Sequence, residues 1–322
     1  MANRIAGFSV CVPVLAFTVL AFSHTAVAAQ LSGDARASIP HDVQQLVVVD
    51  YQAMQNSTSA MELRSRVMPP DLKQFDEALR RSGLNENHDV EDLAFALYRI
   101  PGTASQLETV GVAQGQFDTD SILAGFRKQK VRPLTVRSNR IWPMAHTGMV
   151  LCFVDPSTMI FGSKQAVTQS LNARDGVSSN MLTNGPMMDA MRSVDSAPLW
   201  SILDQEGTQT MMKQILGQAG SVADYDSVRK RLLASWYAMD FTHGVSFDLT
   251  LSTGDSFAAA TVSSLLNAAV LYRKMSGSAT EKQALAATDV SSSGGMLTVH
   301  FATSDDNFAS LLQSSLFQSM VH

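Results

Sequence analysis

The chain has 322 residues, of which 45% are hydrophobic and 16% are charged, and its formal net charge is −5. These proportions are typical of a folded globular protein and exclude an intrinsically disordered chain. A negative balance provides no electrostatic footprint for nucleic acid or for anionic lipid, so we expect no nucleic-acid partner. Beyond the N-terminal segment, no apolar run is long enough to cross a bilayer.

The N-terminal segment, residues 1–29, has the pattern of a secretory signal peptide. Arg4 precedes an uncharged apolar run from Val10 to Phe22. This run is shorter than the roughly 18 to 20 residues of a spanning helix and is interrupted by Pro13, which argues against a retained membrane anchor.

The expected cleavage site lies at the end of this segment. Ala26 and Ala28 supply the small-x-small pattern that signal peptidase accepts, so the mature chain is expected to begin at Ala29 or Gln30. We therefore expect an exported, soluble protein, either periplasmic or secreted, with no membrane span after cleavage.

The chain has two cysteines, Cys11 and Cys152. Cys11 is removed with the signal peptide, which leaves no partner for an intrachain disulfide. Cys152 lies in the apolar run from Met149 to Val154, where a free cysteine is expected to pack as a small buried hydrophobe. The position of Cys11 near the start of its apolar run also argues against a lipid anchor.

The first part of the mature chain alternates strands and helices, identified by β-branched runs, alternating apolar residues, capping residues and turn signals. In chain order, the pattern predicts a strand at Gln45 to Asp50, a helix at Ala60 to Met68, a helix capped by Asp71 and stopped at Gly83, strands at Leu93 to Tyr98 and Val110 to Phe117, a helix after Asp118, a hairpin within Leu134 to Trp142, a second hairpin of Met149 to Val154 with Met159 to Phe161, and a helix capped by Ser163.

The remainder shows the same kinds of pattern after a polar stretch from Arg174 to Pro186. In chain order, it predicts a helix over Met187 to Val194, a strand at Pro198 to Asp204, helices between Thr208 and Leu233, a hairpin of Ser235 to Phe241 with Val245 to Ser252, a long helix after Ser256, a strand at Gly294 to Ala302, and a final helix capped by Asp305 and Asp306.

These elements predict an α+β fold of two lobes, each an antiparallel sheet with helices on one face. We assign residues 40–175 to the first lobe, 176–196 to a linker with a connecting helix, and 197–320 to the second lobe. The order of elements in each lobe approximates β-α-β-β-α-β, as in ferredoxin-like units, and its recurrence suggests an internal duplication.

The sequence offers no metal-binding or cofactor motif. No two histidines of the mature chain have the i, i+4 spacing of a helical metal site. An acidic cluster, comprising Glu86, His88, Asp89, Glu91 and Asp92, lacks the spacing of a calcium loop, and we interpret it as a solvated loop. We therefore predict no bound metal and no cofactor.

No catalytic constellation is apparent either. Ser163 lies on a strand-to-helix turn and is expected to be a helix cap, and the Ser-x-x-Lys match from Ser227 to Lys230 lacks its companion motifs. Phosphate-binding glycine loops are also missing from the sequence. We assign no catalytic residue.

Methionines and tryptophans give the remaining clues. The pairs Met187-Met188 and Met211-Met212 fit core filling better than an adaptable apolar groove. Trp142, Trp200 and Trp236 are expected in the core, although a tryptophan exposed on an open sheet face would indicate binding.

Three passages resemble uncharacterised bacterial exported proteins of duplicated α+β build. They are the helix-Gly-acidic-strand passage from Leu79 to Leu97, the hairpin from Phe153 to Gly162, and the strand Pro198-Leu-Trp200. The resemblance covers most of the mature chain, implies no known activity and transfers no functional residue.

The leading hypothesis is a non-enzymatic binding or scaffold protein that uses a sheet face or the groove between lobes. Its partner is an unknown protein or an apolar small molecule. Two alternatives stay open: a periplasmic carrier of lipid or another apolar ligand, and a hydrolase with a dispersed active site. A closed apolar cavity favours the carrier, polar groups converging in a cleft favour the hydrolase, and an exposed flat sheet favours the binding protein.

Overall fold

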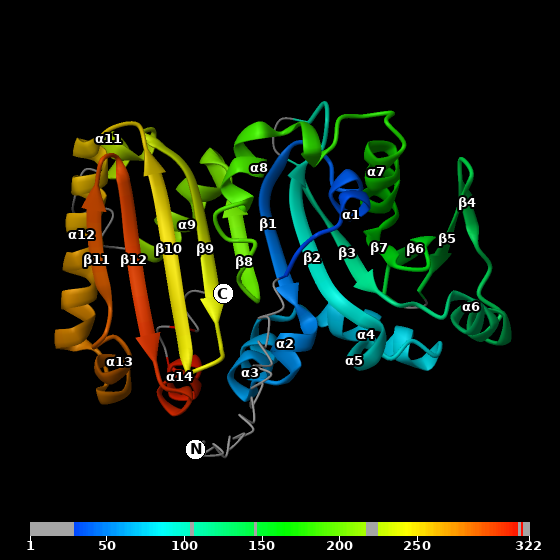
Figure 1. Ribbon diagram of the computed structural model, residues 1–322, viewed down its shortest axis with the longest axis horizontal. Helices are drawn as coiled ribbons and strands as arrows, with labels where there is room; N and C mark the ends of the chain where they lie inside the picture. Colours follow the sequence, from blue (N-terminus) through cyan, green and yellow to red (C-terminus); the bar gives the residue numbers. More distant parts are fainter. Residues whose placement is uncertain (1–28, 104–105, 145–146, 217–224, 315–316, 318–322) are drawn as a thin grey trace, which may run out of the picture.

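The computed structural model describes residues 29–103, 106–144, 147–216, 225–314 and 317. Residues 1–28, including Ala26 and Ala28 of the predicted cleavage site, lie outside the described residues, as does His146. Within the described part, the strands form one 12-stranded sheet in the order β11-β12-β10-β9-β8-β1-β2-β3-β7-β6-β5-β4 (Figure 1). Mixed helices and antiparallel sheet confirm the predicted α+β class.

The strands are β1 Val43–Asp50, β2 Val90–Arg99, β3 Leu107–Gly115, β4 Leu134–Val136, β5 Asn139–Pro143, β6 Met149–Asp155, β7 Thr158–Ser163, β8 Leu199–Leu203, β9 Leu232–Asp240, β10 Val245–Thr253, β11 Asp289–Ser293 and β12 Met296–Thr303. The helices are α1 Gly33–Ala37, α2 Tyr51–Gln55, α3 Thr58–Val67, α4 Pro70–Arg81, α5 Glu86–Asp89, α6 Thr119–Lys128, α7 Lys164–Arg174, the 3₁₀ helix η1 Met181–Thr183, α8 Gly185–Met191, α9 Gln205–Leu216, α11 Tyr225–Arg229, α12 Ser256–Ser276, α13 Ala279–Ala284 and α14 Asp305–Leu312.

The same connection order occurs twice along the chain. Strands β1, β2 and β3 form a meander, and β7 of the later β6–β7 hairpin pairs with β3. Likewise β8, β9 and β10 form a meander, and β12 of the β11–β12 hairpin pairs with β10. Antiparallel pairing of β1 with β8 joins the two sets into one sheet.

This topology differs from the ferredoxin-like units that the sequence predicts. In a split β-α-β unit, a helix carries the chain to a parallel strand. Here β1 and β2 are antiparallel neighbours, although α2 to α5 lie between them in the chain. After helices α2 to α5 the chain therefore returns to the strand directly next to β1, in the opposite direction, and does not cross over to a parallel strand. Whether the two sets arose by duplication, and whether they are separate lobes, stay predictions.

Helices cover both faces of the β1–β3 region, whereas the sequence predicts them on one face only. The residues of β2 alternate between alanines on one face and larger apolar residues on the other. Ala94 and Ala96 share a core with α1, α7 and α8, on the face that we call the first face. Phe95 packs on the second face with Phe75 of α4 and Phe126 of α6. Both faces of this strand are apolar, so both need a covering layer.

The second half of the sheet is covered on the second face. Helices α9, α11 and α12 form a core there with residues such as Leu249, Leu251 and Leu297, and α14 packs beside them on Phe301. In Figure 1 the strands β9, β10, β12 and β11 lie in front of α12, and no helix is drawn in front of them.

Local capping predictions are largely confirmed. Ser163 Oγ accepts from the Ala166 backbone N–H at 3.0 Å and caps α7, and Asp118 caps α6 in the same way. Gly83 follows α4 with a φ of +98°, a left-handed value that favours glycine. The predicted cap at Asp71 is wrong, because α4 begins at Pro70, where proline suits the first helical turn. The predicted cap at Asp305 and Asp306 is also wrong, because these residues lie in the first turn of α14 and Ser304 caps it.

Core assignments also agree with the sequence. Cys152 is buried and free, and burial raises the pKa of its thiol to about 11. Trp142 and Trp200 are buried, and Trp236 is half-buried against the first-face core. Met187 and Met212 are buried too, so the methionine pairs contribute to the core.

Candidate binding face

The candidate functional site is the part of the first face formed by β9, β10, β12 and β11, and we call it the open face. Among the described helices, only α8 contacts it, at β9. Strand alternation and register determine which side chains it carries. They are Ala234, Trp236, Ala238 and Asp240 on β9, Ser246, Asp248, Thr250 and Ser252 on β10, Met296, Thr298, His300 and Ala302 on β12, and Asp289, Ser291 and Ser293 on β11.

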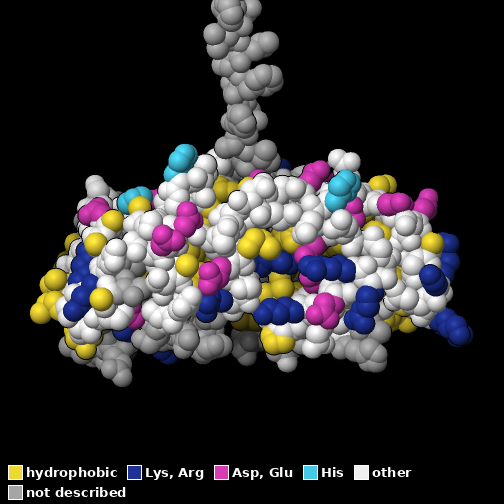
Figure 2. Space-filling view, turned by 90° about the horizontal axis from the view of Figure 1, so that it is seen from below, with side chains coloured by type: hydrophobic (Ala, Val, Ile, Leu, Met, Phe, Trp, Pro, Cys, Tyr) yellow, Lys and Arg dark blue, Asp and Glu magenta, His cyan; other side chains and the backbone are white. Residues whose placement is uncertain are grey.

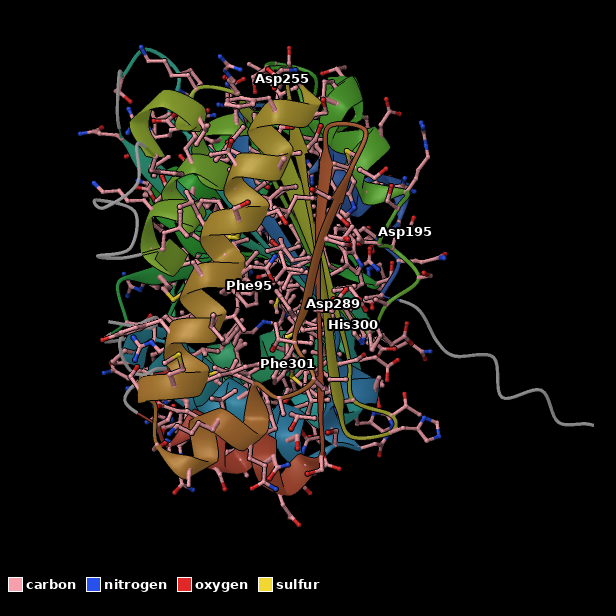
Figure 3. All side chains as sticks on the ribbon, turned by 90° about the vertical axis from the view of Figure 1, so that its left-hand side faces the viewer. Phe95, Asp195, Asp255, Asp289, His300 and Phe301 are labelled. Carbon is pink, nitrogen blue, oxygen red and sulfur yellow. The ribbon has the colours of Figure 1, made fainter. Side chains whose placement is uncertain are left out.

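A histidine between two aspartates lies across three of these strands. His300 on β12 is paired with Asp248 on β10 and with Asp289 on β11. The His300 Nδ1 and Asp248 Oδ1 atoms are 2.7 Å apart, and both side chains are more than half exposed. Figure 3 shows Asp289 and His300 beside each other, with α12 on the other side of the sheet.

Hydroxyl groups form the neighbouring row. Thr298 pairs with Thr250 on one side and with Ser291 on the other. Ser291 Oγ and Thr298 Oγ1 are 2.8 Å apart and hydrogen-bonded. Trp236 follows next to Thr250 and ends the row at the border of the buried first-face core. The row therefore runs from the exposed hydroxyl groups of Ser291 and Thr298 to the half-buried indole of Trp236.

The charged side chains of the open face are mainly acidic. It carries the aspartates named above and, among its described outward residues, neither lysine nor arginine. These side chains stand on paired strands, which fixes their spacing. The face is thus suited to hydrogen bonding and to a cationic partner surface.

This arrangement has little in common with a hydrolase site. The His300–Asp248 pair is solvent-exposed, and no hydrogen bond joins His300 to a serine or threonine hydroxyl among the described residues. A catalytic dyad needs a nucleophile within hydrogen-bond reach and some shielding from water. The observed geometry supplies neither of these features.

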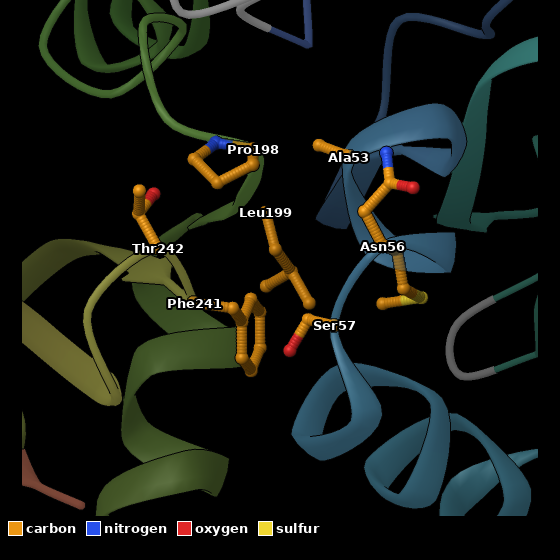
Figure 4. Close-up of a pocket in the computed structure, with 8 residues that line it drawn as sticks. Ala53, Asn56, Ser57, Pro198, Leu199, Phe241 and Thr242 are labelled. Carbon is orange, nitrogen blue, oxygen red and sulfur yellow. The ribbon is translucent and has the colours of Figure 1, made fainter. Parts of the chain in front are cut away.

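A pocket lies between the two halves of the sheet, on the line where β8 meets the end of β1. Its volume is about 260 Å³, and Figure 4 shows its lining. Residues of α2 and the following turn, the start of β8 and the end of β9 contribute to it. They are Ala53, Met54, Asn56, Ser57, Pro198, Leu199, Phe241 and Thr242.

This pocket does not match the cavity expected of a lipid carrier. It is open to solvent, and polar Asn56, Ser57 and Thr242 share its wall with apolar residues. Pockets for whole small molecules usually measure about 300–1,000 Å³. A second pocket of about 290 Å³ is lined by polar and charged residues such as His41, Asp42 and Arg99.

Within the acidic cluster near residue 86, Glu86 belongs to a structural ion network and not to a solvated loop, whereas His88 and Glu91 are exposed. Glu86 is buried and accepts from Arg64 at 3.1 Å and from Arg80. Arg80 also binds Asp76 at 3.0 Å. Figure 2, seen from below, shows basic and acidic side chains interleaved over the half of the molecule that contains α3 and α4. The network links α3, α4 and α5.

Other candidates from the sequence do not assemble into a site. His88 and Asp89 contact each other at 3.0 Å, and Asp92 stands apart on β2. Within the described ranges, no three His, Cys, Asp or Glu side chains are grouped so as to hold a metal ion. The described helices also include none with the length and apolar content needed to cross a membrane.

Comparison with known proteins identifies a fold but no family. No protein-family model and no curated protein sequence matches the chain. The solved structure of TP0453 in crystal form I is similar over 88% of this chain and 96% of its own, at 10% identity and a TM-score of 0.51. TP0453 in crystal form III is similar over 86% and 96%, at 9% identity and a TM-score of 0.52. At this identity the likeness concerns the fold alone.

Proposed function

We propose that the chain is a non-enzymatic binding protein that holds a basic protein partner on the open face. The observation that carries the proposal is a sheet face that the described helices leave open at β10, β12 and β11, whereas helices bury the same face at β1 to β3. Its aspartates complement lysine or arginine, and its hydroxyl row offers donors and acceptors for a polypeptide.

The position of the polar groups supports this proposal over the alternatives. Asp248, His300 and Asp289 come from three neighbouring strands, so their spacing is set by the ladder and needs little ordering on binding. The half-buried Trp236 borders the same surface, and tryptophan is a frequent anchor of protein interfaces.

We also propose that the protein acts after export and removal of residues 1–28, as a soluble periplasmic or secreted body. Arg4, the apolar run to Phe22 and the Ala26-x-Ala28 pattern support this location. Ala29, which directly follows the expected cleavage site, is fully buried in the fold.

A defined basic peptide tests the charge argument. We expect a peptide of alternating lysine and serine to bind, with affinity falling about tenfold in the double variant Asp248→Asn with Asp289→Asn, because two complementary charges are lost. The control Asp34→Asn with Asp306→Asn changes the net charge equally at exposed sites away from the open face. Fluorescence anisotropy measures both. Equal losses in both double variants would show general charge attraction and refute the proposed site.

A further inference from the structure

Two carboxyl groups face each other where β1 and β2 meet, apart from the open face. Asp50 and Asp92 are direct partners in the β1–β2 register, so their side chains stand on the same face of the sheet. Their Cβ atoms are consequently about 5 Å apart. Asp92 Oδ2 accepts from Gln114 Nε2 at 3.2 Å.

Asp50 is incompletely satisfied. Its side chain is 1% exposed, and its Oδ1 atom caps α2 by accepting from the Ala53 backbone N–H at 2.7 Å. Its Oδ2 atom is buried with no hydrogen-bond partner among the described residues. Burial of a carboxylate oxygen without a hydrogen-bond partner costs folding free energy, so a donor at this atom would stabilise the fold.

No positive group within the described ranges forms an ion pair with either aspartate. Burial raises the pKa of Asp50. Burial, followed by the charge of Asp50, raises the pKa of Asp92 to about 7, with a further increase from Glu91 and an opposing effect of the Gln114 hydrogen bond. Asp50 and Asp92 therefore form a pair of acids without an ion-pair partner among the described residues.

The first described residues cross this site. The Ala29 backbone N–H donates to the Ala197 carbonyl oxygen at 3.4 Å, just before β8. The Ala29 carbonyl oxygen accepts from Trp200 Nε1 at 2.8 Å. Ala29 and Trp200 are both fully buried, so this end of the segment is fixed beside β8.

The segment is next fixed at β3. Gln114 Nε2 donates to the Gln30 carbonyl oxygen at 3.1 Å, and Gln114 Oε1 accepts from the Ser32 backbone N–H at 2.6 Å. Strands β8 and β3 are separated by β1 and β2 and are therefore about 14 Å apart, and the side chains of Trp200 and Gln114 reach from them to the segment. Ala29 and Gln30 thus lie between their partners on β8 and β3, over the ends of β1 and β2 that carry Asp50 and Asp92.

The same contacts distinguish between the two cleavage positions that the sequence allows. Cleavage after Ala29 would remove the acceptor of the buried Trp200 indole, which costs roughly 1–3 kcal/mol for an orphaned donor. Cleavage before Ala29 keeps this hydrogen bond and turns the Ala29 amide nitrogen into a free α-amino group.

We propose that the α-ammonium group of Ala29, created by removal of residues 1–28, is the cation that binds the Asp50–Asp92 pair. Hydrolysis of the Ala28–Ala29 peptide bond consumes one water, leaves a carboxylate on Ala28 and an amine on Ala29, and the amine takes up a proton at neutral pH. Processing would then lock the N-terminal segment onto the sheet. This inference rests on the proposed cleavage and is independent of the open face.

The first test compares two recombinant chains that differ only at the N-terminus. One begins at Ala29, and the other carries a short Gly-Ser extension before Ala29. We expect urea unfolding at pH 7.5 to give an unfolding constant at least about tenfold smaller for the chain with the free amine, since each unit of pKa shift is a factor of ten.

A variant pair shows whether this difference arises at the aspartates. In the double variant Asp50→Asn with Asp92→Asn the two chains should unfold equally, whereas the exposed Asp42→Asn control should keep the difference. Equal unfolding constants of the two unsubstituted chains, or a difference that survives the double variant, would overturn the proposal. If Ca²⁺ or Mg²⁺ stabilises both chains alike, the pair is a cation site and the ammonium assignment is wrong.

Two further measurements do not depend on variant stability. The intact mass of the protein purified from its native host should correspond to a chain that begins at Ala29, and any other first residue contradicts the inference. The rate of acylation of the Ala29 α-amine, measured against pH, should give this amine a pKa above the ordinary value of about 8. An amine that reacts like that of a free peptide would also overturn it. None of these measurements depends on partner binding, so the proposed role of the open face is tested separately.

Discussion

The carboxyl groups of Asp76 and Glu86 both bind Arg80 and Arg64 inside the ion network of α3, α4 and α5. Burial and then the hydrogen bond and charge of Glu86 raise the pKa of Asp76 to about 7. The pKa of Glu86 is lowered, since Asp76, Arg64, Tyr51 and Arg80 together outweigh the opposing effect of its burial. At pH 6 we therefore expect a neutral Asp76 beside an ionised Glu86.

The pKa of Asp76 implies a loss of stability with rising pH. The folded state binds the proton more tightly than the unfolded chain, whose pKa is 3.8. This contribution is complete below about pH 4 and is lost as the pH rises through about 7. Between pH 6 and 8 the free energy of unfolding should fall by about 1.4 kcal/mol from this group. The lowered pKa of Glu86 acts at more acidic pH, outside this window.

Glu86→Gln isolates the effect. It removes the charge that raises the pKa of Asp76 and leaves this group alone with Arg64 and Arg80, so the decline between pH 6 and 8 should shrink by about 1 kcal/mol. Urea unfolding at four pH values between 5 and 8 measures it. Glu62→Gln is the control, because Glu62 pairs with Arg66 on the exposed side of α3 at 2.9 Å. An unchanged decline in Glu86→Gln would refute the effect of Glu86 on the pKa of Asp76.

Two more outcomes follow from packing. Gly111→Ala should destabilise the fold by about 1–3 kcal/mol in urea unfolding, because a Cβ at this position would lie 2.2 Å from the buried Phe161 ring. Gly33→Ala meets no atom within 4 Å and should be near neutral; similar effects at both positions would contradict the close contact. The Cys152 thiol should react with a thiol reagent only as fast as the protein unfolds, since it is buried and its pKa is raised to about 11, and rapid labelling of the native protein would show that it is accessible.

Much of the fold is predictable from local sequence. Period-two alternation and β-branched runs locate β1, β2 and β8, and the turn at His243-Gly244 locates the β9–β10 hairpin. Ser163 and Asp118 mark helix starts through their side-chain caps. These signals depend on neighbours in the chain, which the sequence displays directly.

The residues of the open face are harder to predict from the sequence. Strand β11 has the sequence Asp-Val-Ser-Ser-Ser, with one apolar residue, because it lies at the sheet edge with much of its surface in water. Its pattern is that of a loop, so the sequence does not predict the strand or the meeting of Asp289 with His300. A double-glycine turn at Gly294 and Gly295, each with positive φ, is the one local signal of the β11–β12 hairpin.

Strand order is also set by non-local pairing. The sequence suggests ferredoxin-like units, since it shows the order of elements but not which strands are neighbours. It likewise interprets Glu86 as solvated, although Arg64 of α3 neutralises it in the folded chain. Both errors concern contacts between segments that are distant in the chain.

The most direct test of the binding role is photo-cross-linking in the native host. A photoreactive residue replaces Thr298 on the open face or, as a control, the exposed Ser264 on α12. We predict that one partner is captured at Thr298, that the charge reversal Asp248→Lys abolishes this product, and that Ser264 gives none. Capture of the same partner from both positions, or a Thr298 product unaffected by Asp248→Lys, would contradict binding at the open face.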